Sequence, residues 1–345
     1  NGVNAPTYNY LKLNPTSTFA TTSPDISTWN GTGSWSTSAN WSNGVPGAST
    51  NAIIAQSSPT APLLVDVDAQ CNNLTIQVGA YVTVDLGRTL TVNGNFTIES
   101  SATGAGSLIA GGTAGNINII GDIAINQYLL GAKQYHISPP VDNDTLGALQ
   151  AYPTSDNDFY RWREKTSMWI ELNTPIGGTG SQYDPPGDDL REGFGYHVLY
   201  NLSSGTPVTK TYTGDLIFTD VTPSPVTYSP ATADPNWLGA NLVGNPYPCA
   251  IDWDQGNWGK TNIYESIYVW NGLQYLSYNG STGVGSLTGG IIPPMQGFFI
   301  WVNSEDPHNF RIPTDARTHS SQATYKESNV GKDVLKLSLE YSEAT

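Results

Sequence analysis

The chain has 345 residues, among them 36 Gly, 23 Pro and 2 Cys. It carries 14 basic and 29 acidic residues, for a formal net charge of −15. This balance excludes nucleic acid as a partner, because phosphate backbones are bound by Lys and Arg, and it disfavours anionic membranes. Two cysteines exclude a disulfide framework, and no apolar run is long enough to insert into a bilayer. The many turn-forming residues and the lack of long helical periodicity predict an all-β chain.

Residues 1–28 are rich in Thr, Ser, Pro and Asn and are expected to form an extended arm or linker. Three tryptophans follow at intervals of six residues, Trp29, Trp35 and Trp41. They fit an aromatic cap over the end of a β core. They also fit a platform on which sugar rings stack.

A ladder of short apolar segments runs from about residue 51 to 127, and Gly- and Asn-containing turns separate the segments. Such spacing predicts a β-solenoid, in which each coil buries its apolar residues against the next coil. A compact sandwich or jelly roll is the alternative. The segments are 52–55, 63–65, 74–76, 82–84, 90–92, 96–98, 108–109, 117–119 and 123–125.

Three short sequence motifs in the rest of the chain recur in the same order. The offset is 108 residues for two of them (140 to 248 and 159 to 267) and 102 for the third (195 to 297). Ordered matches with one slip predict two copies of one β-rich module. The matches are Pro140 with Pro248, Phe159–Trp162 with Ile267–Trp270, and Gly195–Val198 with Gly297–Ile300.

The predicted fold is therefore a β-solenoid-like domain, or a sandwich, followed by two related sandwich-like or jelly-roll-like modules. A Pro-rich surface connection at Thr222–Pro230 and the strand-like residues 208–212 and 216–218 bridge the two modules. The expected segments are an arm at 1–28, a Trp-capped solenoid at 29–130, a first module plus bridge at 131–235, a second module at 236–310 and terminal strands at 311–345.

Two sequence motifs of the second copy are distinctive: NLVGNPYPCAIDW at Asn241–Trp253 and IPPMQGFF at Ile292–Phe299. With Ile137–Val141 and Glu192–Tyr196 of the first copy, they resemble a region of large secreted surface proteins of the Bacteroidetes. In those proteins the region lies just upstream of the C-terminal sorting domain for type IX secretion. The resemblance covers about residues 29 to 345, and the sorting domain would begin beyond the last residue.

This resemblance implies an extracellular location at the bacterial cell surface and passage through the outer-membrane secretion machinery. It implies no single activity, since the region accompanies adhesins and degradative enzymes alike.

Catalytic machinery is not evident in the sequence. A serine triad would need one of four histidines, and neither a G-x-S-x-G elbow nor an H-E-x-x-H zinc motif is present. We therefore expect no catalytic residues and no required cofactor. The histidines are His136, His197, His308 and His319.

Two Asp-Asn-Asp triplets could hold calcium through Asp142, Asp144, Asp156 and Asp158. Hard cations take several oxygen ligands from a tight loop, which these triplets supply. The same residues fit ordinary Asx turns, which is the simpler interpretation, and neither triplet completes an EF-hand loop. Calcium is therefore an optional ligand in this interpretation.

Aromatic residues are abundant in both copies, and alternate positions such as 160/162 and 268/270 share a sheet face. Most should pack between sheets. A minority exposed in a groove would bind carbohydrate, because sugar C–H faces stack on aromatic rings. The candidates for glycan binding are Trp162, Trp169, Trp253, Trp270 and Tyr275.

Taken together, these features predict a non-enzymatic extracellular stalk, adhesion or binding segment of a secreted protein. Its partner would be a polysaccharide or a cell-surface glycan. The alternative is the ancillary carbohydrate-binding region of a polysaccharide-degrading enzyme whose catalytic domain lies upstream.

Overall fold

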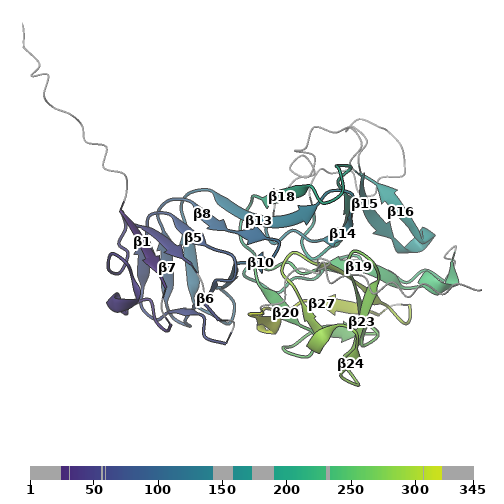
Figure 1. The fold of residues 1–345 in the computed structure, drawn as a ribbon. Helices are drawn as coiled ribbons and strands as arrows, with labels where there is room; N and C mark the ends of the chain where they lie inside the picture. Colours follow the sequence, from purple (N-terminus) through teal and green to yellow (C-terminus); the bar gives the residue numbers. More distant parts are fainter. Residues whose placement is uncertain are drawn as a thin grey trace, which may run out of the picture.

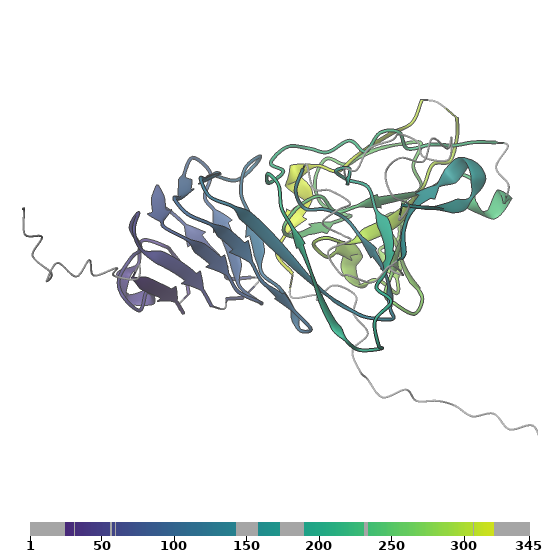
Figure 2. The same ribbon diagram turned by 90° about the horizontal axis from the view of Figure 1, so that it is seen from above.

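The molecule is elongated, with a solenoid at one end and two packed modules at the other (Figures 1 and 2). Its regular structure consists of β-strands and short 3-10 helices, which confirms the predicted all-β class. The computed structural model describes residues 25–320 except 31, 56, 59, 143–157, 173–189, 231–233 and 306.

Helical structure in the described part of the chain is limited to single 3-10 turns. None of its helices is long and apolar enough to span a membrane. The turns are η1 (Ser38–Asn40), η2 (Glu164–Thr166), η3 (Pro235–Trp237), η4 (Thr288–Gly290) and η5 (Thr314–Ala316).

The N-terminal region is a parallel β-solenoid with three faces. Its strands are β1 (Ile26–Trp29), β2 (Asn51–Ile54), β3 (Leu63–Val65), β4 (Ala69–Cys71), β5 (Leu74–Ile76), β6 (Tyr81–Val84), β7 (Thr89–Val92), β8 (Phe96–Ile98), β9 (Ser100–Ser101), β10 (Gly104–Ala105), β11 (Ser107–Ile109), β12 (Asn116–Ile119) and β13 (Ile123–Leu130). Successive coils stack as the parallel sheets β1-β2-β5-β8-β13, β3-β6-β11 and β4-β7-β12, which Figure 2 shows as a ladder. This confirms the solenoid over the sandwich.

A column of four isoleucines runs through the solenoid core. Ile54, Ile76, Ile98 and Ile125 are register partners in successive coils, and each is at most 1% exposed. Alternate side chains of a strand point to opposite faces, so each isoleucine points into the core, and the parallel register of the coils stacks them in a column. Complete burial of each isoleucine contributes about 1.5–3 kcal/mol.

An asparagine ladder fixes the turn that precedes the first strand of each coil. The side-chain Oδ1 of Asn51 accepts a hydrogen bond from the amide N of Asn73 (3.2 Å), and Asn73 Oδ1 accepts one from the amide N of Asn95 (2.7 Å). Asn95 Oδ1 in turn accepts from the amide N of Asp122 (3.0 Å). Backbone donors at the corners are thus satisfied by the coil before them.

The three N-terminal tryptophans cap the solenoid. Trp29, Trp35 and Trp41 are at most 5% exposed, and the rings of Trp35 and Trp41 meet edge to face at 4.7 Å. The indole Nε1 of Trp41 donates to the carbonyl O of Trp35 (2.8 Å). The cap is therefore confirmed. The sugar platform at these positions is wrong, because the ring faces are covered by protein.

The bridge between the modules completes the solenoid sheet. Its strand β18 (Pro207–Tyr212) pairs antiparallel with β13. One cluster of buried residues runs from Trp29 in the cap to Tyr200 in the first copy and includes Met295 of the second. The hydrophobic core therefore continues across the predicted boundary at residue 130.

The two copies form sheets with the same strand order. The first contains β14 (Gln134–Ile137), β15 (Asp158–Arg163), β16 (Met168–Glu171) and β17 (Tyr196–Leu199), and the second contains β19 (Ala240–Gly244), β22 (Ser266–Trp270), β23 (Tyr275–Asn279), β24 (Val284–Gly285) and β26 (Gly297–Trp301). Their orders are β14-β17-β15-β16 and β19-β26-β22-β23-β24. Each strand of the first sheet thus has a counterpart in the second.

Register partners show which residues of the copies correspond. Tyr160 pairs with His197, and Tyr268 pairs with Phe299, as offsets of 108 and 102 require. For the first strand of each copy the offset is 106, because residue 135 lies opposite 198 while 241 lies opposite 300. The offset of 108 that was predicted from Pro140 and Pro248 is therefore wrong by two residues at this strand.

The copies pack against each other through reciprocal contacts, one sheet above the other in Figure 1. Trp162 Nε1 donates to the carbonyl O of Ala240 (2.8 Å), and its counterpart Trp270 donates to the carbonyl O of Gln134 (3.0 Å). Gln134 corresponds to Ala240, so one contact is made twice with the roles exchanged.

Backbone contacts repeat this reciprocity. The amide N of Ser138 donates to Met295 O (3.0 Å), and the amide N of Gly244 donates to Gly193 O (2.8 Å). Ser138 corresponds to Gly244, and Gly193 to Met295. Reciprocal contacts of this kind define a two-fold relation, so the chain contains an internal pseudo-dimer.

The remaining strands complete the second module. They are β20 (Ala250–Asp252), β21 (Gly259–Thr261), β25 (Ile291–Ile292), β27 (Asn309–Arg311) and β28 (Arg317–Thr318). The sheet β25-β20-β28 and the pair β21-β27 place the start of the predicted terminal segment inside this module.

Candidate functional site

Four of the five glycan candidates lie between the two module sheets. Trp162, Trp169 and Tyr275 surround Phe299, with ring centroids 5.5, 6.2 and 5.9 Å from its ring. Trp270 packs on Tyr275 at 5.1 Å. Phe299 is fully buried, whereas the surrounding rings retain partial exposure. These aromatics chiefly join the copies, and among them Tyr275 is 36% exposed.

Trp253 belongs to the core of the second module. Its side chain is fully buried, and its indole Nε1 donates to the carbonyl O of Glu265 (3.0 Å). Trp258 and Phe310 pack on its ring at 4.7 and 6.2 Å. Trp253 as a glycan-stacking residue is therefore wrong, because no sugar can reach either face.

Two histidines of the first copy lie in the same aromatic layer. The rings of His136 and His197 are 5.4 Å apart, and they correspond to Leu242 and Phe299 of the second copy. Burial lowers the pKa of His136 well below its ordinary value, as does the nearby His197. Burial also lowers the pKa of His197 to about 4, although the carboxylate of Asp158 opposes this shift. Both rings are neutral at pH 7 and serve packing.

The other two histidines connect distant segments. His319 shares hydrogen bonds with the hydroxyls of Thr83 (2.9 Å) and Ser107 (2.8 Å), which fastens the end of the second module to the solenoid. Burial lowers the pKa of His319 to about 4. The His308 Nε2 contacts the carbonyl O of Val226 at 2.6 Å.

The calcium candidates are only partly described. Asp144 and Asp156 lie outside the described residues. Asp142 Oδ1 accepts a hydrogen bond from the amide N of Asp215 (3.1 Å), and the Asp142 amide donates to Asp215 O (2.9 Å). Asp158 is the first residue of β15. The described residues contain no group of three or more His, Cys, Asp or Glu suited to a metal ion, and calcium here stays a prediction.

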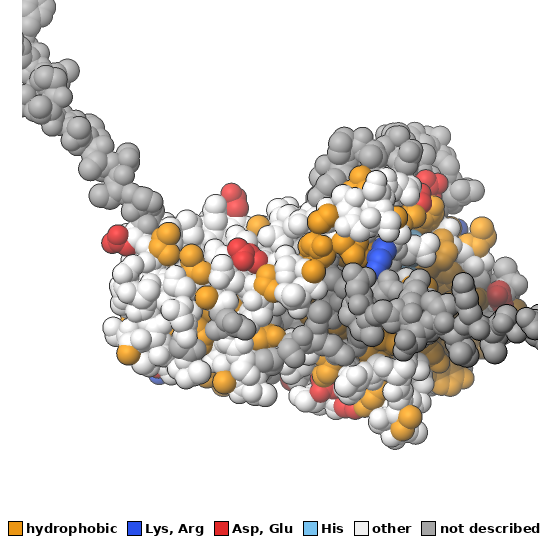
Figure 3. Space-filling view, in the orientation of Figure 1, with side chains coloured by type: hydrophobic (Ala, Val, Ile, Leu, Met, Phe, Trp, Pro, Cys, Tyr) orange, Lys and Arg blue, Asp and Glu red, His pale blue; other side chains and the backbone are white. Residues whose placement is uncertain are grey.

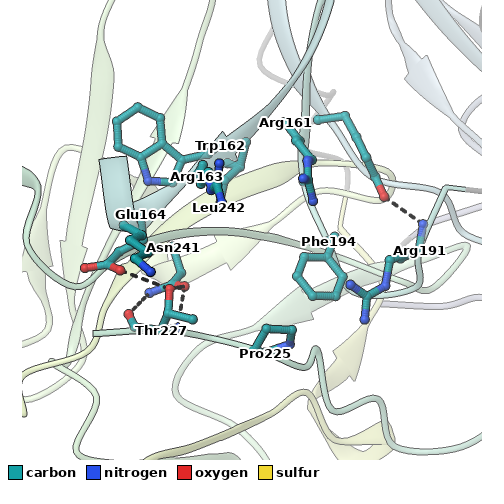
Figure 4. Close-up of a pocket in the computed structure, with 13 residues that line it drawn as sticks. Arg161, Trp162, Arg163, Glu164, Arg191, Phe194, Pro225, Thr227, Asn241 and Leu242 are labelled. Carbon is teal, nitrogen blue, oxygen red and sulfur yellow. Dashed lines mark hydrogen bonds between the residues drawn. The ribbon is translucent and has the colours of Figure 1, made fainter. Parts of the chain in front are cut away.

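A pocket of about 450 Å³ opens between the first copy, the Pro-rich connection and strand β19 (Figure 4). Four segments far apart in sequence supply its walls. The lining residues are Arg161, Trp162, Arg163, Glu164, Lys165, Arg191, Phe194, Gly195, Tyr196, Pro225, Thr227, Asn241 and Leu242.

The lining of this pocket is basic. It contains three arginines and one lysine but a single carboxylate, that of Glu164. Glu164 is 3% exposed, and its Oε1 accepts hydrogen bonds from the amide N of Ser229 (2.9 Å) and of Gly239 (3.0 Å). This carboxylate therefore holds the Pro-rich connection and the start of the second copy in place.

Arg191 is positioned by its neighbours. Its guanidinium lies 4.5 Å from the ring centroid of Phe194, and its Nη2 donates to the carbonyl O of Ser224. The amide N of Arg191 donates to the hydroxyl of Tyr196 (2.7 Å). The charged group is thus fixed on an aromatic wall before any ligand arrives.

The sequence does contain a signal for this pocket. Arg161, Arg163 and Lys165 alternate along five residues of a chain that has only 14 basic residues. Arg161 and Arg163 alternate on β15 and therefore share one face of the strand, and Lys165 follows in η2. Arg191 and Phe194, which complete the wall, carry no local signal because folding alone brings them near.

Comparison with known proteins identifies one family. The family model described as "Domain of unknown function (DUF8693)" matches residues 28–337, a range that includes the solenoid and both modules. No curated protein and no solved structure matches the chain.

Proposed function

We propose that this chain, which belongs to the DUF8693 family, is a non-enzymatic, extracellular binding segment of a secreted cell-surface protein. Its ligand would be a polysaccharide or cell-surface glycan. The observation that carries the proposal is the preformed pocket beside β15, because its size lies within the range of about 300–1,000 Å³ typical of ligand sites.

The walls of this pocket combine flat apolar rings with fixed polar groups. The rings of Trp162 and Phe194 line it, and Trp162 is held by its hydrogen bond to Ala240 O. The amide group of Asn241 donates to the carbonyl O of Thr227 (2.8 Å). Sugars need both an apolar face and directed hydrogen bonds, and fixed walls reduce the entropy lost on binding.

A rigid connection to the solenoid supports the role of a stalk. Gln127 of the solenoid sheet donates from Nε2 to the carbonyl O of Met295 (3.1 Å), and the Leu108 amide donates to Pro248 O (3.0 Å). These bonds join the solenoid to the second copy, while the shared core joins it to the first. A continuous body of this kind can present a pocket at a fixed distance from an attachment point.

The histidines also favour binding over catalysis. His136 and His197 pack between sheets, His319 bridges to the solenoid, and none of the three lines the pocket. An ancillary region of a polysaccharide-degrading enzyme would use the same pocket, so that alternative differs only in the upstream domain.

Retention on immobilised polysaccharides tests the proposal. The full chain should be depleted saturably from solution by at least one polysaccharide of a panel of neutral and acidic polymers. Parallel measurements with calcium and with chelator test the calcium prediction at the same time. Retention by none of the polymers, or release of reducing ends from a soluble polymer, would contradict a non-enzymatic glycan-binding role.

A further inference from the structure

We infer that the pocket beside β15 selects an anionic sugar, a uronate or a sulfate ester within an acidic polysaccharide. This rests on the proposed function and narrows its ligand class.

Charge is the first argument. Ten Lys and Arg residues lie in the described part of the chain, and four of them line this pocket. The chain as a whole has a net charge of −15, and few basic side chains are visible on the face in Figure 3. An acidic protein repels anions over most of its surface, so a basic pocket is the place where an anion can be attracted and held.

The pocket wall places basic groups next to aromatic rings. Figure 4 shows Arg161 above Phe194 and Arg191 beside it, with Trp162 and Arg163 to the left of Arg161. An aromatic ring can take the C–H face of a sugar, while a guanidinium binds a carboxylate or sulfate through two parallel hydrogen bonds. A neutral sugar offers no anionic oxygens for these two parallel bonds.

The second copy lacks several of the residues that line the pocket. At an offset of 108, Arg161 and Arg163 correspond to Val269 and Asn271, which are not basic. At an offset of 102, Phe194 corresponds to Gln296. The second copy has the same strand order and reciprocal contacts without these residues. The fold therefore does not require these basic side chains, and their presence in one copy points to a ligand.

Isothermal titration calorimetry of the full chain tests the inference with three oligosaccharides of equal length. The probes are a galacturonate trimer, a sulfated galactan trimer and a neutral galactan trimer. We expect binding of at least one acidic trimer and at least about tenfold weaker binding of the neutral one, since hydrogen bonds to charged groups are the stronger ones. The two acidic arms separate carboxylate from sulfate recognition. Equal affinity for the neutral trimer would overturn the inference.

Variants then locate the site. Arg163→Asn introduces the residue that the second copy carries at the equivalent position, and Arg191→Gln removes the charge beside Phe194. Each should weaken binding of the acidic trimer about tenfold or more. Arg88→Asn, at an exposed solenoid turn, is the matched control and should bind like the unaltered chain. Circular dichroism and thermal unfolding verify the fold of each variant.

The outcomes separate this inference from the proposed function. If an acidic trimer binds but neither Arg163→Asn nor Arg191→Gln weakens it, the pocket is not the site, although glycan binding stands. If only neutral polymers are retained, the anionic class is wrong while the function holds. If no polymer is retained, the proposed function itself fails.

Discussion

Arg317 shows how one side chain can join segments distant in sequence. It is 9% exposed, and its guanidinium donates to the carbonyl oxygens of Ala110, Gly111 (2.7 Å) and Thr314. Two of these acceptors lie in the solenoid. Removing the donor leaves buried carbonyls without a partner, which costs more than the bond itself contributes.

Arg317→Ala should therefore lower the free energy of unfolding by about 3 kcal/mol. Urea denaturation followed by tryptophan fluorescence measures the change. Arg88→Ala serves as the control at an exposed position and should change stability by less than about 0.5 kcal/mol. Equal effects of the two substitutions would show that the guanidinium does not fasten the module to the solenoid.

His136 and His197 predict a specific pH dependence. Because burial lowers the pKa of both rings, to about 4 for His197, the unfolded chain binds protons below about pH 6.5 that the folded chain does not. Stability is therefore fully present above pH 6.5 and is lost as the pH falls, with a slope of about 1.4 kcal/mol per pH unit for each histidine.

The double variant His136→Leu/His197→Phe carries the residues found at the equivalent positions of the second copy. Its stability relative to the unaltered chain should rise steadily from pH 7 to pH 4. The acidic groups common to both proteins cancel in this difference. Parallel stability curves over this range would contradict the assignment of neutral, buried rings.

At the same scale, the sequence predicted residue types better than residue surroundings. Alternation placed Trp162 and Trp270 on sheet faces, and both are in the aromatic layer. Whether such a face is open or covered depends on a second sheet, and Trp253 shows the error that follows. The basic pocket was missed because half of its wall comes from residues that only the fold brings near.

Among the elements, the solenoid coils depend on stacked residues rather than on local propensity. Strand β5 has only three residues, and its stability comes from Ile54 before it and Ile98 after it in the column. Ile76→Ala would leave a cavity between two rigid coils, with a cost of about 3–4 kcal/mol.

Chemical denaturation should show this loss for Ile76→Ala and a change below about 1 kcal/mol for the outward-facing Thr75→Ala. A small effect of Ile76→Ala would mean that the coils stand without the isoleucine column.

Strand positions in the solenoid were predictable because each coil repeats a short apolar segment between turns. The pairing of β18 with β13 was not, since an antiparallel partner about 80 residues away leaves no periodic trace in sequence. The asparagine ladder is visible in the sequence only once the coil length is known. Local patterns therefore define strands, whereas register needs the assembled coil.

For the whole molecule, the internal two-fold relation requires close backbone approach at two glycines. A Cβ on Gly195 would lie 2.6 Å from the Leu242 side chain and 2.7 Å from the Val243 carbonyl O. The equivalent Gly297 meets His136 and the carbonyl O of Ile137 at 3.0 and 3.1 Å.

Gly195→Ala should destabilise the chain by about 2–3 kcal/mol, because the copies would have to separate to admit the methyl group. Gly297→Ala should cost less, since its contacts are longer. Gly47, which has open space around it, is the control, and Gly47→Ala should be close to neutral. Thermal unfolding that ranks these three differently would contradict the packing of the copies.

The recurring sequence motifs predicted the duplication itself, and the common strand order of the two copies follows from it. The motifs could not show that the copies pack on each other, because sequence order does not encode the axis that relates them. The repeated motifs also could not show the offset of 106 at the first strand. There the proline-rich motifs of the two copies match equally well at an offset of 106 or 108.

The number of binding sites tests the central claim most directly. The basic and aromatic wall exists in the first copy alone, so calorimetric titration with an acidic oligosaccharide should give one site per chain. Arg163→Asn should weaken that single site without changing the fold. Two equal sites would assign binding to the duplicated aromatic layer instead, and no binding of any oligosaccharide would contradict a glycan-binding segment.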